Sequence, residues 1–108
     1  MSDYFRLENV ETRMLLHPET LSWIPQRRDR ERVKPGDIVK LIFVYPSIDD
    51  DKVPRERMWV KVSEKTDRGY RGILDNYPVC SQDLPFGATI DFRSENIVEI
   101  MDDACIKS

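Results

Sequence analysis

The chain has 108 residues, 40% of them hydrophobic and 34% charged, which suits one compact domain and is too short for two. Its 17 basic and 20 acidic residues give a net charge of −3, so bulk charge does not favour binding to nucleic acid or to an anionic membrane. The longest apolar run, residues 41–45, is far shorter than the roughly 20 residues that a membrane-spanning helix requires. We therefore expect a single domain over residues 1–108 that does not bind membranes.

The two cysteines indicate an ordinary cytoplasmic protein. Cys80 and Cys105 are far apart, and neither a CxxC motif nor a Cys/His ligand spacing is present. We expect reduced thiols, with a disulfide as the less favoured alternative, since such bonds are rare in the cytosol. The first residues also lack the basic and apolar stretches of a secretory signal. No metal and no cofactor are predicted.

Residues 1–33 are expected to be mostly helical or irregular. Asn9 can cap a short helix that continues to the break at His17-Pro18, because its apolar residues fall one turn apart. A strand over residues 4–7 is the competing interpretation. Pro25 is a suitable first residue for one or two further helical turns, which end before the next Pro-Gly pair.

Residues 34–101 are expected to form the core of a β-barrel, followed by a polar tail over residues 102–108. In the clearest strand both faces are apolar apart from Lys40, so cover is predicted on both sides. Alternation and turn residues predict five strands, at residues 38–45, 57–63, 70–74, 88–93 and 97–101. The predicted class is α+β: a small antiparallel SH3-like β-barrel or strongly curved sheet of about five strands, with one or two short helices in the N-terminal third.

A succession of motifs begins at the second predicted strand. Glu56-Arg57-Met58-Trp59-Val60 is followed by Gly72-Ile73-Leu74-Asp75-Asn76-Tyr77-Pro78 and then by Leu84-Pro85-Phe86-Gly87. In their order and spacing these motifs resemble the bacterial family called domain of unknown function 2314, over about residues 17–100. Tyr77 departs from the family pattern, which has a glutamate before the proline. The resemblance implies the fold and a bacterial origin, and it transfers no catalytic residue.

Trp59 is the most informative candidate binding residue. By alternation it shares one face of its strand with Arg57 and Lys61. An exposed tryptophan between two cations could stack on a nucleic-acid base, on an aromatic ring of a partner or on a peptide. In the alternative interpretation, which we favour because large aromatics are usually buried, the N-terminal third covers this face and Trp59 belongs to a second small core.

A run of arginines between residues 27 and 32 is the second candidate. Arg27 and Arg28, together with Lys34, Arg55 and Arg57, could form a phosphate-binding patch. The acidic residues interleaved in the run favour instead a solvated helix with internal ion pairs.

No catalytic motif is recognisable in the chain. The acidic run at residues 49–51 lacks the ligand spacing of a calcium loop, and the single histidine, His17, has no nucleophile motif to serve. The favoured hypothesis is a non-enzymatic interaction module that binds a protein or peptide through the barrel face. A nucleic-acid-binding barrel is the alternative, and an enzyme that uses Asp37, Asp75 or Cys80 is the third.

Overall fold

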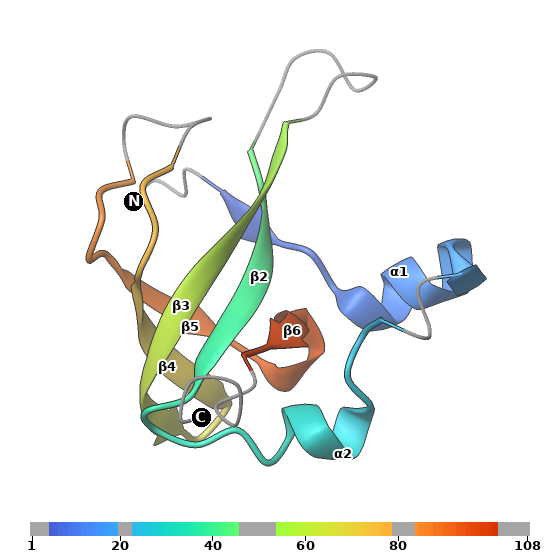
Figure 1. Ribbon diagram of the computed structural model, residues 1–108, viewed down its shortest axis with the longest axis horizontal. Helices are drawn as coiled ribbons and strands as arrows, with labels where there is room; N and C mark the ends of the chain where they lie inside the picture. The colour runs from blue at the N-terminus through green and yellow to red at the C-terminus, as the bar shows by residue number, and fades with distance from the viewer. Residues whose placement is uncertain (1–4, 20–22, 46–53, 79–83, 102–108) are drawn as a thin grey trace, which may run out of the picture.

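The computed structural model describes residues 5–19, 23–45, 54–78 and 84–101 (Figure 1). It contains a curved β-sheet with short helices to one side of it. The strands are β1 (Arg6–Leu7), β2 (Ile38–Val44), β3 (Arg55–Thr66), β4 (Gly69–Leu74), β5 (Thr89–Phe92) and β6 (Ile97–Ile100). The helices are α1 (Val10–Leu16), α2 (Arg27–Arg30) and the 3₁₀ helix η3 (Ser94–Asn96).

The strands pair antiparallel in the order β1-β2-β3-β4-β5. On the edge of β2 that β3 leaves free, β6 pairs with the first half of β2 and β1 with its last two residues. Register shifts between Lys40 and Leu41 and between Val62 and Glu64 mark irregularities that increase twist and help the sheet to curl. The predicted α+β class with a strongly curved antiparallel sheet is confirmed.

The main core fills the concave side of the sheet. Inward-facing positions alternate along the strands and bury Val39, Leu41, Phe43, Met58, Val60, Val62, Tyr70, Leu74, Ile90, Phe92 and Ile97. A second cluster lies on the other face of β2, where Ile42 and Val44 pack with Val10, Ile24 and Val98. Strand β2 is therefore largely buried on both faces, as its sequence, apolar apart from Lys40, predicts.

The predicted helix after Asn9 is confirmed, and the competing strand over residues 4–7 is confirmed only in its second half, since Phe5 lies outside the strand and residue 4 lies outside the described residues. Arg6 and Leu7 form the short strand β1, and Asn9 caps α1 directly after it. The Asn9 carboxamide oxygen accepts hydrogen bonds from the backbone N–H of Glu11 at 2.8 Å and of Thr12 at 3.2 Å. Among the described residues no helix is long and apolar enough to cross a membrane.

Arg30 corrects the interpretation of the arginine run as a wholly solvated helix. Its side chain is only 2% exposed, although it lies in the middle of that run. The guanidinium donates to the backbone carbonyls of Pro25 at 3.0 Å and Ser94 at 3.1 Å, and it pairs with Glu11 at 3.2 Å. These contacts join α2 to α1 and η3, so Arg30 has a structural role.

Candidate functional site

Trp59 lies half-buried on the convex face of the sheet and belongs to neither buried cluster. The prediction that it forms part of a second core is therefore wrong: Val10 of α1 and Ile24 pack on Ile42, Val44 and Val98 of β2 and β6, and this cluster does not extend to Trp59 on β3. Lys40 lies opposite Trp59 on β2, with its Nζ atom 4.5 Å from the ring centroid and 3.3 Å from the Glu99 carboxylate. One face of the indole therefore already carries a cation.

Arg57 and Lys61 are exposed on the same face of β3 as Trp59, as the alternation predicts. Ile73 of β4 pairs with Lys61 and is 39% exposed. The convex face thus offers one partly covered aromatic ring, two exposed cations and one partly exposed aliphatic side chain.

The arginines of α2 do not join Arg55 in one phosphate-binding patch. Arg27 and Arg28 are exposed, and Arg27 lies 3.5 Å from the carboxylates of both Glu11 and Glu31. Arg55 begins β3, at the opposite end of the molecule from α2 (Figure 1). The arginines of α2 and Arg55 therefore lie apart, although the sequence analysis placed them in one candidate patch.

Asp37 and Asp75, the candidate catalytic residues that the structure describes, do not form a common site. The Asp37 carboxylate accepts a 3.0 Å hydrogen bond from the Lys34 backbone N–H and lies 3.5 Å from its Nζ atom, which is a turn interaction. Asp75 is exposed, and Cys80 lies outside the described residues. Neither aspartate lines either of the two hollows described below. In the described ranges no group of three or more His, Cys, Asp or Glu side chains could hold a metal ion.

A hollow of about 1070 Å³ lies between β1 and β5, where the curved sheet is open. Its lining includes side chains that also belong to the main core or pack against it: Phe5, Leu7, Tyr70, Leu84, Ile90 and Phe92. Charged side chains of both signs complete it, namely Arg6, Arg68, Arg71, Arg93, Asp67, Asp91 and Glu95. We call this hollow the seam.

The β5 strand has a free edge at the seam. In the described part of the chain β5 pairs with β4 alone, and Ile90 lies opposite Gly72. Ala88 accepts a 2.8 Å backbone hydrogen bond from Leu74. Because hydrogen-bonded pairs alternate in an antiparallel ladder, the N–H and C=O groups of Thr89 and Asp91 point away from β4. An extended chain could therefore pair with them.

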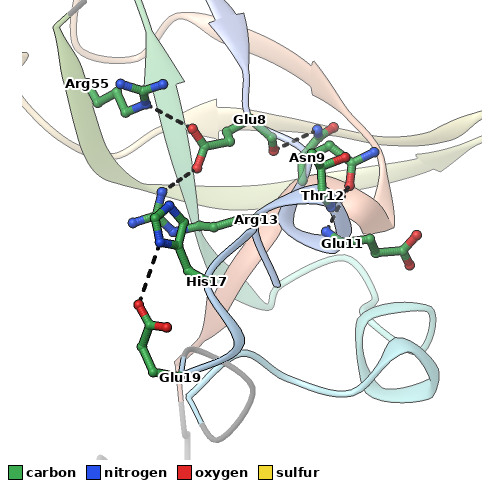
Figure 2. Close-up of polar contacts among 9 residues, drawn as sticks. Glu8, Asn9, Glu11, Thr12, Arg13, His17, Glu19 and Arg55 are labelled. Atoms are coloured by element: carbon green, nitrogen blue, oxygen red, sulfur yellow. Dashed lines mark hydrogen bonds and ion pairs between the residues drawn. The ribbon is translucent and has the colours of Figure 1, made fainter. Parts of the chain in front are cut away.

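A second hollow, of about 550 Å³, contains a cluster of charged side chains (Figure 2). The two carboxylate oxygens of Glu8 bind different arginines: Oε2 accepts from Arg13 Nη1 at 2.7 Å and Oε1 from Arg55 Nε at 2.9 Å. Burial raises the pKa of Glu8, but the hydrogen bonds and charges of Arg55 and Arg13 outweigh it and hold the pKa below its ordinary value of 4.5. His17 lies nearby and is 3.6 Å from Glu19.

No motif or spacing in the sequence indicates the cluster around Glu8. The pairing of Glu8 with Arg55 joins residues 47 positions apart, which depends on β1 pairing with the end of β2. Comparison of the chain with protein-family models, with curated proteins and with solved structures gives no match. The resemblance to the domain of unknown function 2314 therefore stays a prediction.

Proposed function

We propose that the protein is a non-enzymatic interaction module of the cytoplasm that binds an extended peptide segment of a partner protein along the free edge of β5. The observation that supports this function is the one-sided pairing of β5 beside the seam. A strand edge presents N–H and C=O groups at a fixed spacing, and another extended peptide backbone is the ligand that matches it. Such a ligand would also extend the open sheet toward β1.

The lining of the seam indicates which peptides fit. Side chains of an added strand would point alternately to the core side and to the convex side of the sheet. On the core side they would meet apolar residues such as Leu7, Ile90 and Phe92. On the convex side of β5 lie Thr89 and Asp91, and Asp91 is already held by Arg71 at 2.8 Å. The expected ligand therefore alternates apolar and polar residues.

The charges at the seam favour a peptide over nucleic acid. Arginines and carboxylates line the hollow together, so a phosphate backbone would meet repulsive groups such as Asp67 and Glu95. A peptide backbone is neutral and does not pay this cost. The convex face is also less suited to stacking on bases, because Lys40 lies over the ring of Trp59.

Selection from a displayed library of random peptides, with the purified protein immobilised, tests this function. We expect the enriched peptides to alternate apolar and polar residues, and to bind the wild type and Thr89→Val with similar affinity. Thr89→Pro removes the outward N–H donor at an edge position that tolerates proline, and it should weaken binding by at least about tenfold. Circular dichroism establishes that the variant is folded.

Hydrogen exchange of the wild type gives a readout that does not depend on a variant. Binding of a selected peptide should slow exchange of the Thr89 and Asp91 amides, because both become hydrogen-bonded. If no peptide is enriched, or if the selected peptides leave these amides unprotected, the proposed function is wrong.

A further inference from the structure

The arginines around Glu8 carry more N–H donors than the Glu8 carboxylate accepts. Glu8 takes one hydrogen bond from each of two arginines, through Arg13 Nη1 and Arg55 Nε. Within the described residues, the terminal nitrogens of Arg55 and the second terminal nitrogen of Arg13 have no acceptor. Arg6, which lines the same hollow, forms no ion pair or side-chain hydrogen bond with a described residue. Several guanidinium donors are therefore unused.

Arg13 contains a buried donor without a partner. Its Nε atom is buried and forms no hydrogen bond in the structure. A buried N–H that lacks an acceptor costs roughly 1–3 kcal/mol, so the Arg13 guanidinium is under-satisfied. A ligand in the hollow would bind its second terminal nitrogen, which is not buried, rather than Nε. The hollow that Arg13 lines has room for a small polar ligand.

The charge of the lining identifies the class of that ligand. Among the lining side chains, Arg6, Arg13 and Arg55 exceed the one carboxylate, that of Glu8, by two positive charges; Glu19, 3.6 Å from His17, is not part of the lining. The Arg13 and Glu8 side chains are only 24% and 13% exposed, so water screens this excess less than it would on an open surface. Guanidinium groups bind tetrahedral and planar oxyanions through pairs of parallel hydrogen bonds.

We propose that this hollow is a binding site for a phosphate group, with Arg6, Arg13 and Arg55 as its ligands. A phosphate group supplies several acceptor oxygens and up to two negative charges, which matches both the unused donors and the charge excess. Glu8 holds Arg13 and Arg55 in position, so the site is formed before the ligand arrives. The proposal is independent of peptide binding at the seam, which shares only Arg6 with this hollow.

Nuclear magnetic resonance of the arginine Nε–H groups tests the site directly. The wild type is titrated with inorganic phosphate and, at matched ionic strength, with sodium chloride. We expect saturable shifts of the Arg13 and Arg55 Nε–H signals with phosphate and none with chloride. Parallel titrations with acetate and with a phosphoserine-containing peptide, against its unphosphorylated form, distinguish a general anion site, a free-phosphate site and a site for a phosphate attached to a peptide.

Matched variants distinguish this site from non-specific binding to arginine. Arg6→Gln changes an exposed side chain without an ion pair, so the fold should be unaffected while phosphate affinity falls by about tenfold. Arg13→Gln should lower affinity further. Arg28→Gln is the control, since Arg28 is exposed on α2, outside the hollow. Absence of saturable shifts with millimolar phosphate, or equal losses in Arg28→Gln and Arg6→Gln, would overturn the proposal.

Discussion

The hydroxyl of Tyr70 donates a buried 3.0 Å hydrogen bond to the backbone carbonyl of Arg30. This bond joins the inner face of β4 to the backbone of α2. The side chain of the same Arg30 binds Ser94 of η3 and Glu11 of α1. Tyr70 also stacks on Phe92 of β5, with ring centroids 5.4 Å apart. One tyrosine thus connects the sheet core to the N-terminal third.

Alkaline pH should destabilise the protein through Tyr70. Burial, followed by the negative charges of Glu31 and Asp37, raises the pKa of Tyr70 above its ordinary value of 10.0. The unfolded chain therefore loses this proton at a lower pH than the folded chain does, so stability is fully present below about pH 10 and falls above it. Tyr70→Phe should cost about 1 kcal/mol at neutral pH, since it removes one hydrogen bond, and should flatten this alkaline loss. Urea denaturation between pH 8 and pH 11 measures both effects. An equally steep alkaline loss in the variant would contradict the assignment to Tyr70.

Glu8→Gln should have opposite effects on stability and on phosphate binding. The arginines lower the pKa of Glu8, so its contribution to stability is present above about pH 4.5 and is lost as pH falls through the lower folded-state pKa. At pH 7 we expect the variant to lose about 1–2 kcal/mol and to show a weaker acid dependence. Phosphate affinity should rise, because the hollow loses its negative charge. Denaturation at pH 3 to pH 7 and the phosphate titration are the measurements. Weaker phosphate binding by a folded Glu8→Gln protein would contradict this expectation. It would show that the Glu8 carboxylate raises phosphate affinity by positioning the arginines more than it lowers that affinity by repulsion.

Much of the fold follows from local pattern. The apolar run of β2, the alternation in β3 and the cap at Asn9 each predict the element that forms, because burial and capping act over neighbouring residues. The side chains of the two hollows could not be found in this way. Glu8 meets Arg55 and Arg30 meets Ser94 only after strands distant in sequence have paired. Nothing in the run around Arg30 distinguishes it from its exposed neighbours, since its burial is decided by α1 and η3.

Gly72→Ala should be among the most destabilising single-methyl additions in the sheet. A Cβ atom at this position would lie 2.5 Å from the Val60 Cγ1 atom and 2.6 Å from the Lys61 carbonyl oxygen, so backbone must move. Overpacking of this kind costs about 1–3 kcal/mol, and the contact with backbone favours the upper part of that range. Gly36→Ala is the control: its Cβ would meet no atom within 4 Å, and the φ of +98° leaves conformational strain of about 1–2 kcal/mol. Urea midpoints of the two variants test the order. A smaller loss for Gly72→Ala than for Gly36→Ala would show that the sheet relaxes at this point.

Trp59 decides between the peptide and nucleic-acid hypotheses. Because the indole is half-buried and in contact with Lys40, Trp59→Ala should fold and lose about 1–2 kcal/mol. We expect the wild type to show no retention of single-stranded RNA or DNA at low salt, since Lys40 already occupies one face of the ring. Peptides selected at the seam should bind Trp59→Ala as well as they bind the wild type. Fluorescence anisotropy with labelled oligonucleotides at low and high salt measures the first expectation. Oligonucleotide binding that weakens with salt and disappears in both Trp59→Ala and Arg57→Ala would instead assign the convex face to nucleic acid.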